Sequence, residues 1–422
     1  GGDSGPALVI GNIDDSLLLE RIFLPIDDDE IMPPENGPLT LKQQDILKRW
    51  VMTGASWPKG TQLFPLSMKE LALREGASSK KLIELVVHPS EISLSTEEDF
   101  NSFVVVAKYD DDVTRDVTKE SSISISNSSV IRMENNTIYP LKDGNSSLSI
   151  SFQNLKSNLA VSVKKAQAER PVSFNLDVMP VFLKAGCNTG SCHGSARGQD
   201  RFMLSLFGYD AKGDHYRITR EQGTRRINLA IPEESMLVEK AIAAVPHTGG
   251  KLFEKNSDHW HTLVNWLKRG APEDPKDVAK AVDIELLPKS LLLEGKGAIQ
   301  QMVVMAHYSD GTSRDVTSLS VFQTNNDVSA QVDKKGLIVA DKRGEAFITA
   351  RFDIFTKGTQ VIVIPEDLKY ARPHLETNNF IDQLVYDKLH KLRIYPSDLC
   401  SDEVFLRRVY LDVTGGVPDV DT

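Results

Sequence analysis

The sequence contains little cysteine, no long apolar run and no excess of positive charge. Its three cysteines, Cys187, Cys192 and Cys400, are too few for a disulfide framework and odd in number. No apolar run reaches the roughly 18 residues that a membrane-spanning helix needs, and residues 1–4 lack the charged and apolar parts of a signal peptide. We therefore expect no transmembrane segment, an export signal only upstream, and a chemical role for the close pair Cys187 and Cys192.

The charge balance argues against nucleic acid as a partner. The 422 residues carry a formal net charge of −10, and acidic and basic residues are interspersed, so no basic face is available for a phosphate backbone. A chain of this length exceeds the roughly 100–200 residues of an ordinary domain. We therefore expect a modular protein of several domains.

A strand-rich segment occurs twice. Residues 108–118 (KYDDDVTRDVT) match residues 307–317 (HYSDGTSRDVT), and both follow apolar residues that alternate with the period of two of a half-buried strand. Around each copy, short segments rich in Val, Ile, Ser and Thr are separated by turn residues. This spacing predicts two β-sandwiches, at 81–168 and 281–365.

A helical signature also occurs twice. Residues 14–20 (DDSLLLE) correspond to 233–239 (EESMLVE), and residues 49–55 (RWVMTGA) correspond to 265–271 (NWLKRGA). In the first pair of segments, polar residues precede an apolar run. In the second pair, an amphipathic helix contains a tryptophan, and the helix ends at a glycine. The chain is therefore predicted to alternate helical modules with sandwiches.

The boundaries follow from these repeats. After residue 373 the apolar spacing predicts two further helices, without a finished core. The predicted order is a first helical module at 1–60, a linker at 61–80, a sandwich at 81–168, a second helical module at 170–275, a second sandwich at 281–365 and a helical segment at 373–422.

The segment from Cys187 to His193 (CNTGSCH) ends in the Cys-His pair that covalent haem attachment requires. The two thiols would add to the porphyrin vinyl groups, and His193 would lie under the iron as the proximal ligand. Four residues separate the cysteines, whereas the familiar motif has two. Asn188 and Gly190 tolerate the positive φ that a bulge of this kind needs. The motif predicts one covalent haem c on Cys187, Cys192 and His193.

Three other interpretations of the cysteine pair remain open. The thiols could form a disulfide, could bind zinc with His193 and one further ligand, or could be ordinary buried thiols. The sequence offers no fourth zinc ligand at finger-like spacing. The helical repeat favours haem over these alternatives.

The repeat also points to a distal iron ligand. Met32, which precedes Pro33 and Pro34, lies 18 residues before Trp50, and His247 lies 19 residues before Trp266. We predict His247 as the distal ligand, and a bis-His haem should have a low potential compared with a His/Met site. Met32 would bind a second haem only if an upstream segment supplied its attachment motif.

Oxygen ligation by a tyrosine is the alternative for the distal position. Tyr209 is the better placed candidate and Tyr216 the second choice, followed by His215, His259 and His261. An open distal position would favour small-ligand chemistry.

With these residues, the chain resembles the large multidomain cytochrome-c-like surface proteins abundant in planctomycete bacteria. The resemblance implies that 1–60 is the C-terminal half of a first α-helical cytochrome c-like module and that 170–275 is a second such module. It also implies that the sandwiches are bacterial immunoglobulin-like (Ig-like) domains, marked by the Arg-Asp-Val-Thr motif. Residues 373–422, with the run FLRRVYLDVTG, resemble the opening of the family's uncharacterised helical domain.

We expect a c-type cytochrome that exchanges electrons with a redox partner protein in the periplasm or another extracytoplasmic compartment, in association with the cell surface. No catalytic residue is assigned, and the oligomeric state is left open. The alternatives are a surface binding or structural protein with Ig-like domains and a non-catalytic haem, or a haem enzyme with peroxidase-like or small-ligand chemistry.

Overall fold

The computed structural model describes residues 6–25, 28, 30–32, 39–56, 80–170, 172–366, 368, 377–396 and 400–419. The chain divides into two compact units, Gly1–Ser79 and Lys80–Thr422. Pro33, Pro34 and the predicted linker up to residue 79 lie outside the described residues.

The first unit holds two helices, α1 (Leu17–Ile22) and α2 (Leu41–Met52). Thr40 and Gln43 form a capping box that satisfies free N–H groups at the start of α2. The buried Ser16 hydroxyl accepts a hydrogen bond from the Val9 amide. Beyond the end of α2, the Trp50 indole donates to the Ser56 carbonyl. Local hydrogen bonds therefore fix both helix starts and the chain beyond α2.

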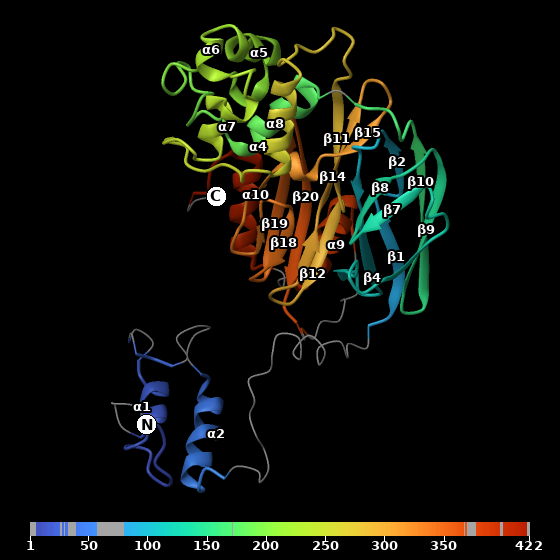
Figure 1. The fold of residues 1–422 in the computed structure, drawn as a ribbon. Coiled ribbons are helices and arrows are strands. Elements are labelled where there is room, and N and C mark those ends of the chain that lie inside the picture. The colour runs from blue at the N-terminus through green and yellow to red at the C-terminus, as the bar shows by residue number, and fades with distance from the viewer. Residues whose placement is uncertain are drawn as a thin grey trace. The chain divides into compact units, whose positions relative to one another are not determined.

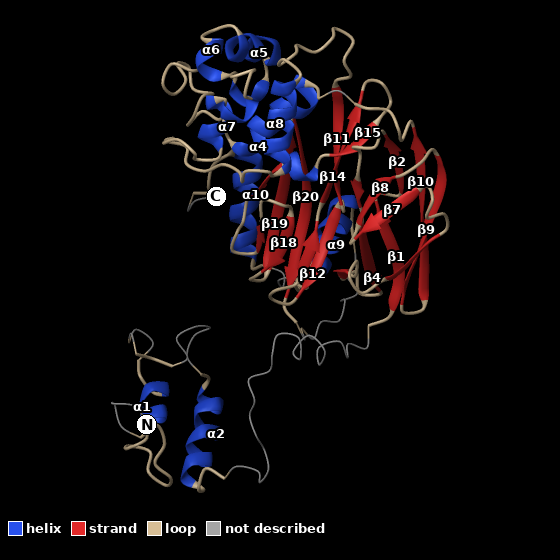
Figure 2. Ribbon diagram, viewed as in Figure 1, coloured by secondary structure: helices blue, strands red, loops and turns tan. Residues whose placement is uncertain are grey.

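The second unit is built mainly of strands (Figures 1 and 2). The first sandwich contains β1 (Leu82–His88), β2 (Glu91–Ser95), β3 (Asn101–Ser102), β4 (Val104–Tyr109), β5 (Thr114–Asp116), β6 (Ser122–Ile125), β7 (Ile131–Glu134), β8 (Thr137–Pro140), β9 (Gly144–Phe152) and β10 (Leu155–Lys164). The second contains β11 (Ala281–Leu287), β12 (Ser290–Glu294), β13 (Ile299–Gln301), β14 (Val303–Tyr308), β15 (Ser313–Asp315), β16 (Val321–Thr324), β17 (Ala330–Val332), β18 (Leu337–Ala340), β19 (Gly344–Phe352) and β20 (Phe355–Ile364).

The two sandwiches have the same topology. The sheet orders β1-β4-β5, β2-β10-β9-β6 and β3-β8-β7 recur as β11-β14-β15, β12-β20-β19-β16 and β13-β18-β17. Both copies have one parallel pair, β2 with β10 and β12 with β20. Val104 of β4 corresponds to Val303 of β14, a shift of 199 positions. Short paired strands in facing sheets define two Ig-like β-sandwich domains.

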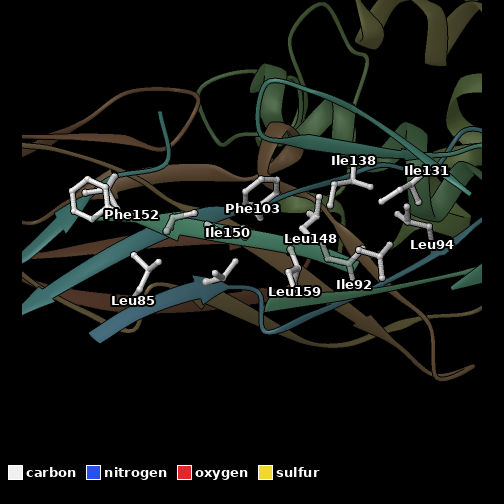
Figure 3. Close-up of a cluster of buried hydrophobic side chains, with 14 of the residues drawn as sticks. Leu85, Ile92, Leu94, Phe103, Ile131, Ile138, Leu148, Ile150, Phe152 and Leu159 are labelled. Carbon is white, nitrogen blue, oxygen red and sulfur yellow. The ribbon is translucent and has the colours of Figure 1, made fainter. Parts of the chain in front are cut away.

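The core of the first sandwich lies between its facing sheets (Figure 3). Along β9 buried and exposed residues alternate, so that Leu148, Ile150 and Phe152 point to the same side. Leu159 of β10 and Ile92 of β2 belong to the same sheet, and Phe103 and Val105 join them in the core from outside that sheet. The alternation read from the sequence thus corresponds to one buried face per strand.

The two sandwiches contact each other through their Arg-Asp-Val-Thr turns. Asp116, at the end of β5, accepts a hydrogen bond from the Gln301 amide of the second sandwich at 2.9 Å. Asp315, at the end of β15, accepts one from the Ser102 amide of the first sandwich at 2.8 Å. Ser102 and Gln301 are equivalent positions, so the two bonds are reciprocal. A small apolar cluster of Val104, Leu287, Val303 and Met305 lies beside them.

A helical region connects the sandwiches. Its elements are η1 (Phe174–Val178), α4 (Met179–Ala185), η2 (Leu206–Gly208), α5 (Ala211–Thr219), α6 (Gly223–Arg226), η3 (Pro232–Glu234), α7 (Met236–Ala241) and α8 (Asp258–Lys268). Phe174, Phe182 and Trp266 are buried in its core. The Trp266 indole donates to the Pro272 carbonyl, as Trp50 does to Ser56 in the first unit.

The helical region packs against the second sandwich, at one end of its strands (Figure 2). Lys184 of α4 donates hydrogen bonds to the carbonyls of Ser320 and Lys334. Asp177 forms a bidentate ion pair with Arg170 and lies 3.7 Å from Arg314. The helical region is thus anchored to the second sandwich by charged and polar contacts.

The prediction of alternating α-helical cytochrome c-like modules and sandwiches is wrong. In the part of the chain that the structure describes, β-sheets dominate and no cytochrome-like helical module is evident. Between residues 172 and 280 the longest helix, α8, has 11 residues, and irregular turns fill the stretch from Cys187 to Ser205. The repeated signatures marked short helices correctly, but glycines such as Gly186 and Gly198, both at positive φ, interrupt what lies between them.

Two helices follow the second sandwich, α9 (Phe380–Lys391) and α10 (Asp402–Thr414). Arg393, just after α9, donates to the Asp111 carbonyl, and Arg343 donates to the carbonyls of Leu392 and Arg393. Among the described residues, no helix is both long enough and apolar enough to span a lipid bilayer.

Candidate functional site

The segment between the two cysteines forms a closed turn after α4. The helix ends at Gly186, whose φ of 77° is left-handed, and the Cys187 amide then bonds to the Phe182 carbonyl. The His193 amide donates to the Cys187 carbonyl at 3.0 Å. The turn therefore brings the histidine back to the first cysteine, although four residues separate the cysteines. Asn188 and Gly190, expected at positive φ, are absent from the positive-φ positions, so that prediction is wrong.

Gly194 allows this turn to close. A methyl group on Gly194 would lie 2.2 Å from the Asn188 carbonyl oxygen and 2.8 Å from that of Thr189. The Gly194 amide itself bonds to Thr189 at 2.9 Å. The backbone of the turn therefore leaves no room for a side chain at position 194, directly after His193.

The rings of His193 and His247 lie close together, with nearly parallel planes. Their centroids are 6.4 Å apart and their planes differ by 11°. Two imidazoles that bind one metal ion from opposite sides, with nitrogens about 2 Å from the ion, have ring centres roughly 6 Å apart. The observed separation is compatible with a single ion between the two rings.

Hydrogen bonds hold one nitrogen of each ring. Nδ1 of His193 lies 2.8 Å from the Phe202 carbonyl, and Nδ1 of His247 lies 3.4 Å from the Gly250 carbonyl. An imidazole whose Nδ1–H is bonded to a carbonyl presents a free Nε2 lone pair, which is the usual arrangement of a metal-binding histidine. Burial lowers the pKa of His193 and keeps the ring neutral, with a smaller contribution from His247 and Lys240.

Cys187 and Cys192 are free thiols beside the two histidines. Burial, with a smaller contribution from the nearby Cys192, raises the pKa of Cys187 to about 12, so the thiol is protonated at neutral pH. No group of three or more His, Cys, Asp or Glu side chains that could hold a metal ion occurs within the described ranges. The cysteines and histidines are therefore arranged as two pairs around one pocket.

The pocket beside these residues has apolar walls and a charged side. Its empty volume is about 850 Å³, with open solvent at its mouth included. Arg225, Arg226 and Lys240 contribute the positive charge. The apolar lining consists of Phe182, Phe202, Leu204, Met236, Leu237, Ala241, Leu252, Phe253 and Leu263.

The structure does not bring the alternative distal ligands into this pocket. Tyr209 is 74% exposed, and Tyr216, 58% exposed, lines a separate pocket with Asp210 and Arg217. The buried His215 bonds through Nε2 to the Ala271 carbonyl.

The remaining candidates lie elsewhere as well. His259 packs against Phe253, and His261 packs against Trp260. Met32 belongs to the first unit and is 40% exposed. Among the candidates in the described residues, Cys187, Cys192, His193 and His247 line one pocket, whereas His215 and Tyr216 line another.

Sequence reasoning missed four residues of the pocket. Phe202 packs on the His193 ring at 4.7 Å and bonds it through its carbonyl, a contact that leaves no side-chain signal in the sequence. Arg225, Arg226 and Lys240 belong to helices α6 and α7. The only sequence signal for them was the Arg-Arg pair before a predicted helix. Such pairs also occur at ordinary exposed positions, so this one did not point to a pocket.

No family model matches the chain. No curated protein matches it either. Among solved structures, the S-layer protein SbsC (domains 5–6) matches with 10% identity, 67% of this chain, 99% of that chain and a TM-score of 0.26.

Two further solved structures match over a comparable share of this chain. SbsC domains 4–9 match with 12% identity, 68% of this chain, 32% of that chain and a TM-score of 0.23. Human protocadherin-24 EC1-2 matches with 7% identity, 68% of this chain, 99% of that chain and a TM-score of 0.15. All three scores lie below 0.5, so the assignment of the Ig-like sandwiches rests on the strand pairing described above.

Proposed function

We propose that this is an extracytoplasmic surface protein whose two Ig-like sandwiches support a small helical region that holds one covalent haem c and transfers electrons. The resemblance to planctomycete multidomain surface proteins belongs to this proposal. In it, Cys187 and Cys192 bear the thioether links, His193 is the proximal ligand and His247 the distal ligand.

The observation that carries the proposal is the pair of nearly parallel imidazoles. Their 6.4 Å separation and 11° interplanar angle would suit two imidazole ligands of one iron, and both Nδ1 atoms are bonded to carbonyls. Gly249 supports the same role, because a methyl group there would lie 2.8 Å from His247 Cε1 and would displace the ring. The apolar walls suit a macrocycle, and the two free thiols beside the histidines suit its vinyl groups.

A bound haem would supply one-electron redox chemistry at the site. Carbonyls of this chain accept from or orient Nδ1 of His193 and His247, burial lowers the pKa of His193, and Phe182, Leu204 and Leu263 supply apolar walls. With both axial positions filled by imidazole, the site favours electron transfer over small-ligand binding.

A surface structural or binding protein in which the haem has no redox role is the second candidate. The reciprocal bonds of Asp116 and Asp315 favour it, since they join the sandwiches into a continuous body suited to a spacer or docking surface.

The decisive experiment uses protein matured with its native secretion machinery. Intact mass should show one added haem, and reduction should give sharp low-spin α and β bands. His247→Ala should replace the low-spin spectrum by a high-spin one that shifts with carbon monoxide, while Tyr209→Phe, the matched control, should leave it unchanged. An intact mass without haem would remove the proposal, and a wild-type high-spin spectrum that responds to carbon monoxide or peroxide would favour a haem enzyme.

A redox role is tested separately from haem binding. Haem could be attached and low-spin while no partner protein reduces or oxidises it at a useful rate. That result would contradict electron transfer and support the surface structural or binding protein.

A further inference from the structure

We propose that Arg225, Arg226 and Lys240 form a cationic cluster that binds the two propionate carboxylates of the haem and thereby sets its potential. This inference rests on the proposed function, because it assigns the polar groups of the ligand in that same pocket.

The first step is the charge of the pocket wall. Its charged lining residues are three cations, Arg225, Arg226 and Lys240, and one carboxylate, Asp200, a net charge of about two positive. The whole chain has a formal net charge of −10, so the positive charge of this cluster is opposite in sign to that of the chain. A ligand with a planar apolar body and two carboxylates complements both the apolar walls and this charge.

The second step is the rigid position of Arg226. Its guanidinium lies 4.2 Å from the centroid of the Phe202 ring, and that ring packs on His193. Nη1 of Arg226 donates to the carbonyls of Arg217 and Glu221, and its Nε and Nη2 have no partner among the residues described. Arg226 is thus held near the iron ligand with donors left for an anion.

The third step is the freedom of the other two cations. The guanidinium of Arg225 has no hydrogen bond or ion pair with any residue that the structure describes, and Arg225 is exposed. Within the same described residues, the ammonium of Lys240 pairs only with Asp200, at 3.8 Å, and that carboxylate is 77% exposed. Exposed pairs of this length contribute little, so both side chains can turn to a stronger partner.

Positive charge beside a haem has a defined effect. It stabilises the electron-rich reduced state and the ionised carboxylates, so it raises the midpoint potential and lowers the propionate pKa. The cluster would therefore partly offset the low potential expected of a bis-His site.

The test uses the haem-loaded full chain and the variants Arg225→Gln and Lys240→Gln, singly and together. Lys212→Gln is the matched control, since this exposed lysine lines the separate pocket that includes Tyr216. The midpoint potential at pH 7 should fall in each single variant and further in the double variant. The propionate pKa is seen as the pH at which the midpoint potential starts to depend on pH. This pKa should rise by about one unit or more in the variants, because an opposite charge within a few ångströms lowers a carboxyl pKa by about 1–3 units.

The two proposals fail in different ways. Wild-type protein without haem by mass overturns the proposed function. Haem that is attached and low-spin, with potential and pH profile unmoved in the double variant, overturns the cationic cluster alone. If the double variant does not mature, Arg225→Lys decides: a normal potential and pH profile support the cluster, and a loss of haem in this charge-preserving variant contradicts it.

Discussion

Two glycines of the cysteine turn differ sharply in what an added methyl group would meet. On Gly194 it would lie 2.2 Å from the Asn188 carbonyl oxygen, whereas on Gly190 its nearest neighbour is Leu206 Cδ1 at 3.8 Å. Gly194→Ala should lower the free energy of unfolding by about 1–3 kcal/mol or more, because backbone must move. Urea unfolding followed by tryptophan fluorescence measures this change.

Gly190→Ala is the control within the same turn. It should change the free energy of unfolding by less than about 0.5 kcal/mol and leave haem attachment intact. Equal stability of the two variants would contradict the closed turn.

Lys184 should make stability depend on pH in the alkaline range. Burial lowers the pKa of this lysine from 10.5 to about 8. Because the folded pKa lies below the unfolded one, the unfolded chain binds more protons between these values, and stability should rise as pH increases from about 8 to 10.5. The neutral amine still donates hydrogen bonds to the carbonyls of Ser320 and Lys334.

The measurement is urea unfolding at several pH values for wild type and for Lys184→Met, which keeps the apolar stem. The variant should lose this rise, and the exposed Lys212→Met should retain it. A rise of the same size in Lys184→Met would assign it to other groups.

Residue types were easier to predict than residue surroundings. The pattern of Cys187, Cys192, His193 and His247 could be read from the sequence, and the structure brings these four together. The carbonyl of Phe202 that orients His193 could not be read, since any residue type supplies a carbonyl. The ligand roles of these residues stay predictions.

At the scale of single elements, the Arg-Asp-Val-Thr turns have a role that the sequence did not reveal. One oxygen of Asp116 accepts from Thr118 within its own turn, and the other accepts from Gln301 of the second sandwich. Asp315 divides its oxygens in the same way between Thr317 and Ser102. The motif is thus both a turn and an interdomain contact.

Asp116→Ala and Asp315→Ala should each lower the free energy of unfolding by about 1–3 kcal/mol, since each leaves partly buried N–H groups without an acceptor. Asp310→Ala is the control, because this exposed aspartate makes the same local bonds to Thr312 without crossing to another domain. Its loss should stay below about 1 kcal/mol. Equal losses at all three positions, measured by denaturant unfolding, would show that only the local turn matters.

Strands were more predictable than helices in this chain. Alternation of period two in segments such as β9 reports a buried face directly. The helical signatures predicted short elements such as α7 and α8, but the overall cytochrome-like fold inferred from them was wrong, because irregular turns determine the path between them. Long-range contacts, such as those of Asp116 and Asp315, have no local pattern at all.

At the scale of the whole second unit, the sandwiches should unfold together. Reciprocal hydrogen bonds and the apolar cluster of Val104, Leu287, Val303 and Met305 couple them. Ile150→Ala, in the core of the first sandwich, should cost about 2–5 kcal/mol. Hydrogen exchange should then accelerate not only in β9 but also in β19 of the second sandwich. Acceleration confined to the first sandwich would show independent domains.

The reciprocity of the two aspartates makes the contact isologous, as in a homodimer with a two-fold axis, because each sandwich offers its partner the same patch. Here the two partners belong to one polypeptide. Their association is therefore intramolecular, and it does not depend on how much protein is present. Dilution that would separate a homodimer held by the same bonds leaves this pair joined.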